Sequence, residues 1–531
     1  MEKNSRTFRF TGTQAQTPAI AGLLRAQGFR FEPLPFYQDA MLLLEEPFPL
    51  GSSLAAKFGY IYIQDASSML PALALSGLIQ AGKADRSDRA GAARAEWTEG
   101  AGYAGGAAGV DAAKAPAREL AVLDVCSSPG GKSSLLARVL GGRHGEECTD
   151  ASALSGFVLA NEPGVKRLGT LRRNLQSMNL LNSGTCSYGG ESFPLPSASP
   201  AAAEHPTFPG WDYILLDPPC SGWGTVEKNP QVLSLWQGDK LKPLVGLQRM
   251  LLREAFRLLR PGGCLTYSTC TVNVQENEEQ VRWALSELDA EAGGGVISLV
   301  PLAQYEGFAF EAPWPSGATD NLQAGKGTDC DGVLRVPMHS PLGQGFFVAA
   351  LRKGDHAAPL ADLKRAGLKK AQTAAKKRGA VNGSRKAGRD SAQEPPEPVF
   401  LPHSAIEAPL VSSALLPPGQ LALQRGNLSF LPQAGLELLP PGFAWNGYPL
   451  GKSTGEGSRP RVDTSARALM PSVEEAGARG ADVLDVDEPS VVTALLSGQS
   501  LAFPARGAEV GLYFKGLPLC RLKARGGRVF L

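Results

Sequence analysis

The sequence predicts an α/β protein built on a doubly wound, mostly parallel sheet. Through the middle of the chain, short apolar runs alternate with helical stretches, and each run ends in a turn signal. Such alternation is typical of parallel strands joined by crossover helices that cover both faces of a sheet. Polar and reactive residues follow these runs directly, which is where ligands bind on sheets of this kind. A small N-terminal extension and a mostly β C-terminal part are expected on either side of the sheet.

Composition narrows the class of protein. The chain has 531 residues and a formal net charge of +2, and 43% of its residues are hydrophobic. This length suggests about three domains. The cysteines contain no CxxC pair, so neither a disulfide framework nor a structural zinc site is expected. No apolar run is long enough to span a bilayer, and the first residues lack the apolar core of a signal peptide. We expect a cytoplasmic monomer with free thiols, no metal and no membrane contact.

The first part of the chain predicts short elements and then a loose insert. Residues 17–29 have helical apolar spacing. Residues 58–75 predict a short strand, a turn and a helix start capped by Asp65 or Ser67. Residues 83–118 are rich in Ala and Gly with scattered charges. They are expected to be loose because they cannot bury enough apolar surface to offset the entropy of ordering them.

The central sheet is predicted from apolar runs of seven to nine residues with helical segments between them. Its expected strands are residues 119–125, 156–162, 211–217, 263–269 and 345–353. The helical stretches between them include residues 166–180 and 247–263. The last strand is expected to close the domain.

A basic segment separates the sheet from the C-terminal part. Residues 354–398 read as a linker, and from residue 364 to residue 389 there are Lys and Arg but no Asp or Glu. A run of this kind is either a solvated tail or a segment that holds the phosphates of a nucleic acid. After residue 399, strand-like segments and turns resume, which predicts a small mixed or mostly β domain.

The stretch "LDVCSSPGGKSSLLA" (residues 123–137) places a Gly-rich loop between a strand that ends in Asp124 and a helix. Such a loop lets a ligand approach the N–H groups of a helix N-terminus. A P-loop would need Gly where Cys126 stands, six residues before Lys132, and GxGxxG is also absent. A site for a nucleoside-type cofactor and a plain βα turn both remain open. Glu162, at the end of the next strand, either holds ribose hydroxyls or caps the following helix.

Two cysteines follow two further strands. "ILLDPPCSG" (residues 214–222) places Asp217 and Cys220 behind a buried strand, and "LTYSTCT" (residues 265–271) does the same for Cys270. The paired prolines stiffen the first of these loops. A lone cysteine at such a position is more often an inert buried residue, but two beside a candidate cofactor loop favour nucleophilic chemistry.

Together these motifs resemble the NOL1/NOP2/Sun family of RNA cytosine-C5 methyltransferases, and within it the bacterial ribosomal RNA branch of the RsmF type. The segments that carry the resemblance are "YIQDASSMLPALAL", "CSSPGGKSS", "ANEP", "DPPCSGWGT", "NPQVLSLW", "LQRMLLREAFRLLRPGGCLTYSTCTVNVQENE" and "GFFVAALRK". They cover about residues 40–353, apart from the inserts. Residues 450–470 resemble the C-terminal region of this branch, which is PUA-like and binds RNA.

The resemblance implies a class I S-adenosyl-L-methionine-dependent methyltransferase fold with a PUA-like C-terminal domain. It implies an N-terminal RNA-binding subdomain (residues 1–70), a methyltransferase domain (71–353), a basic linker (354–398) and a C-terminal RNA-binding domain (399–531). The implied product is 5-methylcytosine in RNA, most plausibly in small-subunit (16S) ribosomal RNA. The same chemistry on tRNA is one alternative. A non-catalytic ribosome assembly factor is another, although such a protein would be expected to lack one of the two cysteines.

The resemblance also implies residue roles. Cys270 would be the nucleophile that adds to cytosine C6, Cys220 would assist release, and Asp217 would hold the N3 edge of the base. The implied cofactor contacts are Cys126, Ser127, Ser128, Pro129, Gly130, Gly131, Lys132, Glu162 and Asp217. The family has an acid after its third strand that reads the adenine amine. Gly189 stands at that position here, with Glu191 two residues later. Lys132 is expected to contact the cofactor or RNA, or to favour a nearby thiolate.

Overall fold

The computed structural model describes most of the chain outside its inserts. The described residues are 6–82, 119–141, 156–190, 193, 210–235, 238–314, 330–356, 398–439, 443–453 and 459–531. The predicted loose insert 83–118, the basic run 364–389 and Glu191 lie outside them. Within the described residues, no helix has the length and apolar character needed to cross a bilayer. The same residues contain no cluster of three or more His, Cys, Asp or Glu side chains suited to a metal ion.

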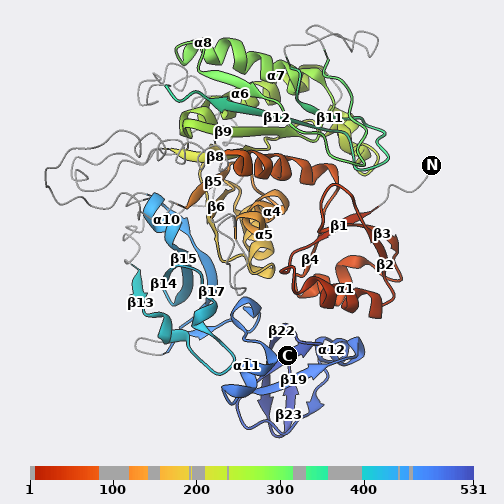
Figure 1. Ribbon diagram of the computed structural model, residues 1–531, viewed down its shortest axis with the longest axis vertical. Coiled ribbons are helices and arrows are strands. Elements are labelled where there is room, and N and C mark those ends of the chain that lie inside the picture. Colours follow the sequence, from red (N-terminus) through yellow and green to blue (C-terminus); the bar gives the residue numbers. More distant parts are fainter. Residues whose placement is uncertain are drawn as a thin grey trace, which may run out of the picture.

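One large sheet forms the centre of the molecule (Figure 1). Its strand order is β10-β12-β9-β8-β5-β6-β7-β16, and β11 pairs with β12. The strands are β5 (Leu120–Asp124), β6 (Gly156–Asn161), β7 (Ser183–Cys186), β8 (Trp211–Leu216), β9 (Leu259–Thr269), β10 (Ile297–Val300), β11 (Leu334–Val336), β12 (Phe346–Lys353) and β16 (Trp445–Asn446). From β9 to β7 all neighbours are parallel, whereas β12 runs antiparallel between β9 and β10. This arrangement confirms the predicted class I methyltransferase fold.

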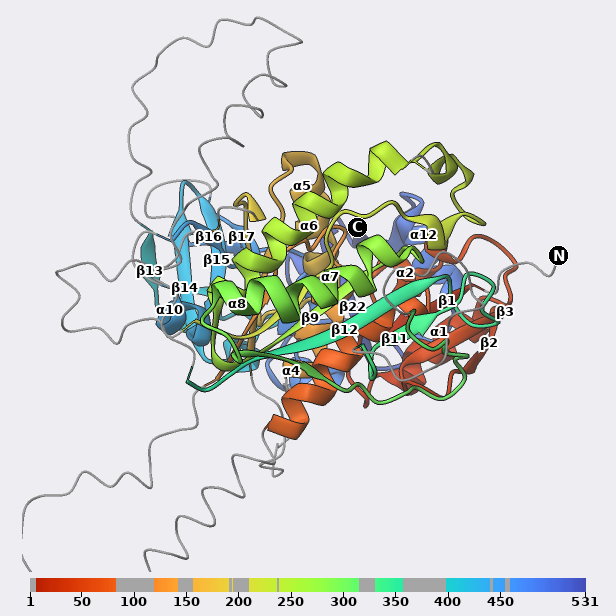
Figure 2. The same ribbon diagram turned by 90° about the horizontal axis from the view of Figure 1, so that it is seen from above.

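Helices cover both faces of the sheet, as a doubly wound fold requires. On one face, α4 (Gly131–Leu140), α5 (Val165–Ser177) and the helix at residues 70–82 pack into one apolar core. On the other face, α6 (Gly238–Leu258) and α7 (Glu278–Trp283) pack into a second core. Figure 2 shows α6 and α7 lying over β9 and β12. The two cores fix the direction of every loop at the strand ends.

The boundary between α6 and β9 differs from the prediction. The helix was expected at residues 247–263, but it begins at Gly238 and ends at Leu258, and β9 begins at Leu259. Pro261 has no N–H to donate, and Gly262 has a φ of +72°, which a helix does not allow. The strand absorbs both residues where its register against β8 shifts. The Pro-Gly-Gly sequence therefore marks a bulge inside a strand.

The N-terminal residues form a separate antiparallel sheet in the order β2-β3-β1-β4. Its elements are β1 (Thr7–Phe10), α1 (Thr17–Ala26), β2 (Arg30–Pro33), β3 (Ala40–Glu45), α2 (Leu54–Lys57) and β4 (Ile61–Ile63). After β4, the backbone N–H of Ser67 donates to Asp65 Oδ1 at 3.1 Å. The N-cap of the 3-10 turn at Ser67–Met69, which leads into the helix at residues 70–82, is Ala66 and not Asp65 or Ser67 as expected, although Asp65 accepts this bond beside it.

The C-terminal part is mostly β, as predicted, and contains two five-stranded sheets. The first comprises β13 (Val399–Leu401), β14 (Gly419–Gln424), β15 (Asn427–Pro432), β17 (Tyr448–Lys452) and β18 (Arg461–Val462). The second comprises β19 (Asp482–Val486), β20 (Leu501–Ala502), β21 (Glu509–Phe514), β22 (Leu517–Arg525) and β23 (Arg528–Phe530). Helices α10 (Gln433–Leu438), α11 (Val473–Ala478) and α12 (Pro489–Leu496) pack against them. The edge strand β16 belongs to this part of the chain but pairs with β7 of the central sheet.

The N-terminal sheet and the second C-terminal sheet share one apolar core. Phe8, Leu24 and Leu54 pack into the same cluster as Val492 and Leu512. The sheets lie side by side in Figure 1, coloured red and dark blue. The two ends of the chain therefore form one joint body beside the central sheet.

Arg467 joins this body to the central domain. Its guanidinium donates to the carbonyls of Ser177 (2.5 Å) and Gly59 (3.0 Å) and lies 4.2 Å from the centre of the Tyr60 ring. Ser177 ends α5, so one buried side chain links three parts of the fold.

Candidate active site

All the predicted site residues follow the ends of four adjacent parallel strands. The strands are β6, β5, β8 and β9, in that spatial order. Because parallel strands end at the same edge of a sheet, the four loops after them meet there. The loops after β5 and β6 carry the candidate cofactor residues. The loops after β8 and β9 carry the two cysteines.

The loop between β5 and α4 contains the predicted cofactor residues Cys126 to Gly131. The backbone N–H of Ser127 donates to the carbonyl of Asn161, at the end of β6, at 3.0 Å. Gly130 has a φ of +107°, and an added Cβ would lie 2.9 Å from Leu171 Cδ1 of α5. The loop therefore passes so close to α5 that glycine is required at this position. Ser128 and Pro129 are also tied to α5, through Arg167 and Asn174.

Asp124 lies beneath this loop with one carboxylate oxygen unused. Its Oδ2 accepts a hydrogen bond from Ser133 Oγ at 2.6 Å, while Oδ1 is buried and has no partner among the described residues. Burial raises the pKa of Asp124 to about 6, since desolvation outweighs the hydrogen bond from Ser133. A buried acceptor without a donor is costly, so this oxygen suits a ligand that brings an N–H or O–H group.

Glu162 sits at the end of β6, where the sequence placed it. Its Oε1 accepts from the backbone N–H of Gly164 at 2.8 Å, and its Oε2 lies 3.2 Å from Arg167 Nη2. Gly164 itself is the N-cap of α5, so Glu162 supports the helix start without being the cap residue. Each oxygen retains a lone pair, and the carboxylate can still accept from hydroxyl groups of a ligand.

Asn161 was not singled out from the sequence, although it directly precedes Glu162. Its side-chain N–H group donates to the carbonyls of Val125 and Tyr188, each at 3.0 Å. Its Oδ1 accepts from the backbone N–H of Tyr188 at 2.8 Å. Asn161 thereby ties together the loops after β5, β6 and β7. Gly189, where the family carries an acid, follows Tyr188 in this third loop.

The structure brings the two predicted cysteines into contact. Cys220 Sγ and Cys270 Sγ are 3.1 Å apart, and both thiols are free and half-buried. Cys220 lies in the loop after β8 and Cys270 directly follows β9. The backbone N–H of Gly224 donates to the carbonyl of Cys270 at 3.1 Å, which binds the two loops together.

Asp217 lies between the cofactor loop and the thiols. Its Oδ2 accepts from Lys132 Nζ at 2.7 Å and its Oδ1 from Ser268 Oγ at 2.7 Å. Ser268 was missed from the sequence, although it stands two residues before Cys270. Burial alone would lower the pKa of Lys132, but the Asp217 carboxylate raises it above its usual value. Lys132 thus remains a cation, and its ammonium is directed at Asp217.

The electrostatic surroundings differ between the two thiols. The pKa of Cys270 is lowered, chiefly through its hydrogen bond with Cys220, and the Lys132 charge adds to this effect. The pKa of Cys220 is correspondingly raised by that hydrogen bond and by burial. Cys126 is the third thiol at this edge, and desolvation raises its pKa. The lowered pKa distinguishes Cys270 from the other two thiols, whose pKa values are raised.

Known proteins resemble this chain over the same region. Residues 112–352 match the family model of the 16S rRNA methyltransferase RsmB/F. A protein of Cronobacter sakazakii named ribosomal RNA small subunit methyltransferase F is 31% identical over 358 residues, which cover 67% of this chain and 58% of that protein. Its namesake from Pectobacterium atrosepticum is 30% identical over 360 residues, with the same coverage. The matched part thus spans somewhat under two thirds of the length of these relatives.

Solved structures give a weaker likeness. A methyltransferase homolog from Pyrococcus horikoshii is 25% identical, covers 66% of this chain and 87% of its own, and has a TM-score of 0.43. The structure titled NSun6 from Pyrococcus horikoshii with SFG is 17% identical, covers 66% of this chain and 91% of its own, and has a TM-score of 0.44.

Proposed function

We propose that the chain is an S-adenosylmethionine-dependent RNA cytosine-C5 methyltransferase, because residues 112–352 match the family model of the 16S rRNA methyltransferase RsmB/F. The proposed product is 5-methylcytosine in small-subunit ribosomal RNA, the RNA named for its relatives. One observation supports the chemistry most strongly. Cys220 and Cys270 lie 3.1 Å apart beside a carboxylate, at the edge of the sheet where the cofactor loop also ends.

Two thiols suit this reaction because cytosine C5 is a poor nucleophile. Addition of a thiolate to C6 forms a sulfur–C6 bond and makes C5 electron-rich enough to accept a methyl group. Loss of the C5 proton and cleavage of the sulfur–C6 bond then restore the aromatic ring. Attack and release make different demands on a side chain, so a separate group for each step is chemically reasonable.

We assign the attack to Cys270. Its pKa is lowered by the hydrogen bond from Cys220 and by the nearby Lys132 ammonium, which increases its thiolate fraction. Cys220, whose pKa is raised, is assigned to assist removal of the C5 proton and departure of Cys270. The contact between the two sulfur atoms would allow both to reach the same base.

Asp217 is proposed to hold the N3 edge of the cytosine. Lys132 and Ser268 occupy its two oxygens and fix the carboxylate beside the thiols. The Asp217 carboxylate can accept from the exocyclic amino group at this edge. As negative charge develops on the base during attack, the adjacent Lys132 cation stabilises it.

The residues of the β5 and β6 loops fit an S-adenosylmethionine site. The unpartnered Oδ1 of Asp124 suits an ammonium or hydroxyl donor, and Glu162 lies where ribose hydroxyls are held in folds of this type. The loop from Cys126 to Gly130 and the first residues of α4, Gly131 and Lys132, would form the wall of this site. When bound, the cofactor supplies an electrophilic methyl group. The protein residues hold it, exclude water and keep the reacting cytosine in place.

RNA is the proposed macromolecular partner. We propose that the N-terminal sheet and residues 399–531 bind it. The N-terminal sheet and the second C-terminal sheet share one core, and Arg467 joins them to α5. The proposed domain limits remain those indicated by the sequence. The basic run 364–389 is proposed to add phosphate contacts, which would make binding depend on salt.

The most direct test uses the different roles of the thiols. Full-length Cys220→Ala, incubated with small-subunit rRNA and S-adenosylmethionine, should attack the base and transfer the methyl group but release it poorly. A covalent protein–RNA adduct should then appear as a denaturant-resistant shifted band. Cys270→Ala should give no adduct, and neither should the double variant. Cys264→Ala, which removes another half-buried thiol of β9, is the matched control and should behave as wild type.

The opposite pattern, with adduct in Cys270→Ala alone, would exchange the two roles. No adduct in any variant and no 5-methylcytosine by bisulfite sequencing would overturn the proposed chemistry. Adduct with tRNA but not with small-subunit rRNA would keep the chemistry and change the substrate.

A further inference from the structure

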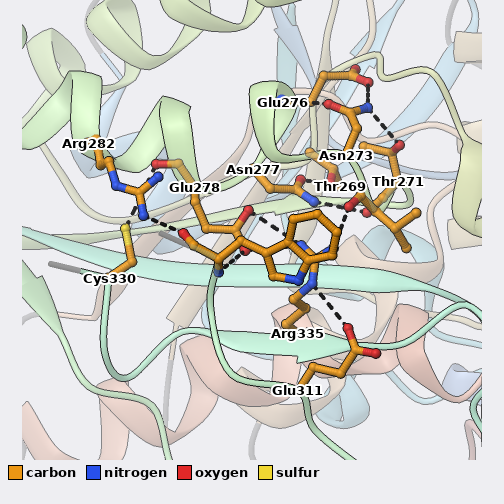
Figure 3. Close-up of polar contacts among 12 residues, drawn as sticks. Thr269, Thr271, Asn273, Glu276, Asn277, Glu278, Arg282, Glu311, Cys330 and Arg335 are labelled. Carbon is orange, nitrogen blue, oxygen red and sulfur yellow. Dashed lines mark hydrogen bonds and ion pairs between the residues drawn. The ribbon is translucent and has the colours of Figure 1, made fainter. Parts of the chain in front are cut away.

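Both cysteine loops are attached to one buried carboxylate that no step above uses. Glu276 is completely buried at the end of the short 3-10 helix η6 (Val274–Glu276). Its Oε1 accepts from the backbone N–H of Ser221 at 2.9 Å and from Gln248 Nε2 at 2.8 Å. Its Oε2 accepts from Asn273 Nδ2, and Asn273 Oδ1 in turn accepts from the N–H of Glu276 (Figure 3). Three N–H donors thus converge on the carboxylate and both of its oxygens are hydrogen-bonded.

These contacts hold the backbone on both sides of Cys220. Ser221 directly follows Cys220 and donates its N–H to Glu276. Gln248, which reaches across from α6, donates both to Glu276 and to the carbonyl of Pro219, which directly precedes Cys220. The Cys220 backbone therefore cannot shift without breaking the hydrogen bond from Ser221 to Glu276 or the one from Gln248 to Pro219.

The same cluster holds the Cys270 loop. Thr271 Oγ1, one residue after Cys270, lies 2.8 Å from Ser221 Oγ, and Asn273 Nδ2 donates to both hydroxyl oxygens at 3.1 Å. On the strand before Cys270, Tyr267 OH donates to the carbonyl of Glu276 at 2.7 Å. One network thus joins the two loops behind the thiols and sets the separation of the sulfur atoms.

The charges around the thiol pair come from several elements. Asp217 lies on the β8 loop, Lys132 on α4, Glu276 on η6, and Tyr267 on β9. The pKa of Cys220 is raised by the hydrogen bond to Cys270, by burial, and then by the negative charges of Cys270, Glu276 and Asp217. Lys132 instead lowers the pKa of Cys270. The positive charge thus acts on one thiol and the Glu276 charge on the other.

We propose that Glu276 is a positioning residue that keeps the two thiols in contact and whose negative charge keeps the proton on Cys220, leaving Cys270 as the thiolate. This inference rests on the proposed function, in which the two thiols have different roles. Glu276 touches neither the base nor the cofactor and acts only through the loops and charges of its neighbours. Among the described residues its carboxylate forms no ion pair, so its charge is not neutralised locally.

A neighbouring carboxylate shows what a purely structural role looks like. Glu278 is also completely buried, but its carboxylate pairs with Arg335 at 3.0 Å and accepts from the Trp314 backbone at 3.2 Å. Figure 3 shows this ion pair beside the Glu276 cluster. Its charge is balanced by the arginine and no hydrogen bond joins it to Ser221, Thr271 or Gln248. Glu278→Gln is therefore a matched control for loss of a buried carboxylate.

Two substitutions distinguish the effect of the Glu276 charge from the effect of its side-chain length. Glu276→Gln keeps the length and removes the charge, whereas Glu276→Asp keeps the charge and shortens the side chain. In the full-length protein without RNA, the rate of alkylation of each thiol by iodoacetamide is followed against pH by peptide mass spectrometry at early times. In wild type, Cys270 should react at lower pH than Cys220. In Glu276→Gln, the Cys220 profile should move down by about one pH unit, which is a roughly tenfold faster reaction at neutral pH.

Glu276→Asp should leave both alkylation profiles in place but lower kcat by ~10-fold or more, because the thiols are held less well. KM for S-adenosylmethionine should stay within about twofold of wild type. Unchanged alkylation of Cys220 in Glu276→Gln, or an equal shift in Glu278→Gln, would overturn the electrostatic part. Unchanged kcat in Glu276→Asp would overturn the positioning part.

Should neither Glu276 variant fold, Gln248→Met carries the positioning test. It removes the donor to Glu276 and Pro219 and keeps the charge, so kcat should fall without a change in thiol alkylation. The alkylation readout also separates this inference from the proposed function. A shift of the Cys220 profile without any RNA methylation would support Glu276 and contradict the function. RNA adducts in Cys220→Ala together with unchanged thiol profiles would do the reverse.

Discussion

The loops after β5 and β6 and the loops after β8 and β9 form two halves of one active edge, and Asp124 in the first half is partnered differently from the carboxylates of the second. At the β5–β6 half, Asp124 Oδ1 is buried without a partner, and burial raises the pKa of the group to about 6. At the β8–β9 half, Glu276 has donors on both oxygens, and Asp217 has Lys132 and Ser268. A buried acceptor left unpaired costs about 1–3 kcal/mol, so it is tolerated where a ligand will pair it. The first half therefore keeps an acceptor free for a ligand, whereas the second half holds its own side chains in fixed positions.

This difference has a physical reason. A ligand-binding group gains affinity when its hydrogen bonds form only in the complex, because the free protein carries the cost of desolvation. A reacting group gains rate when its position and charge are fixed before the substrate arrives. The first two predictions below test one half each, the third tests the ionisation of Asp124, and the fourth tests a site remote from both.

The largest effect is expected at the thiol half. Cys270→Ala should lower kcat for methyl transfer by more than ~10³-fold, because no other thiol at the edge has a lowered pKa. Its affinity for S-adenosylmethionine, measured by calorimetry, should stay within about twofold, since Cys270 forms no hydrogen bond to the β5–β6 loops. Cys264→Ala is the control. Appreciable turnover by purified Cys270→Ala would show that the nucleophile lies elsewhere.

The next effect is expected at the cofactor half. Asp124→Asn should weaken S-adenosylmethionine binding by ~10- to 100-fold, because the amide cannot provide the anionic acceptor. The alkylation profiles of Cys220 and Cys270 should stay as in wild type. Ser133→Ala, which removes only the partner that Asp124 already has, should weaken binding less. Equal losses in the two variants would mean that Oδ1 does not face the cofactor.

The ionisation of Asp124 should make cofactor affinity and the free energy of unfolding depend on pH. If the cofactor donates to its carboxylate, binding requires the ionised form, so affinity should fall about tenfold per pH unit below pH 6. Asp124→Asn should remove this slope. Without cofactor, the raised pKa means that the folded state binds more protons than the unfolded state, so the free energy of unfolding should fall as pH rises from 3.8 to about 6. A flat affinity between pH 5 and about 7 would contradict the assignment.

The smallest effect on the active edge is expected from a change remote from both halves. Arg467→Ala removes the donors to Ser177 and Gly59 and the contact with Tyr60, and should cost about 2 kcal/mol of unfolding free energy. RNA affinity should weaken while cofactor affinity and thiol alkylation stay unchanged. Arg479→Ala, whose bonds stay within the C-terminal part, is the matched control. Loss of cofactor affinity in Arg467→Ala would mean that the joint body also sets the geometry of the cofactor loop.

The parts of the fold that follow local rules were predictable from the sequence. Apolar runs indicated β5, β6, β8 and β12 to within a residue or two, because strands that are buried on both faces need continuous apolar stretches. The pair "DPPCSG" and "STCT" led to the correct prediction that two thiols share one sheet edge. Pro261 and Gly262 misled the prediction of the α6 boundary, because the same residues that end helices also form bulges in strands.

The residues whose roles were not predicted from the sequence depend on contacts between segments that are distant along the chain. Glu276 and Asn161 stood inside quoted motifs, but their function lies in partners 27 to 55 residues away along the chain. The role of Arg467 likewise follows only from its hydrogen bonds to the carbonyls of Gly59 and Ser177. No local pattern distinguishes a buried carboxylate balanced by arginine, such as Glu278, from one that acts on a thiol.

The shared core of the two chain ends has a consequence for biosynthesis. Tyr60 donates to the carbonyl of Pro518, a contact that spans 458 residues. Phe8 and Leu24 pack in the same cluster as Leu512 and Val529, so the part of this core that the C-terminal strands cover stays exposed until those strands have been made. At a synthesis rate of roughly 5–20 residues per second, that exposure lasts on the order of half a minute or more. Throughout this time the nascent N-terminal sheet presents an apolar surface to its surroundings, and we expect chaperones to cover it.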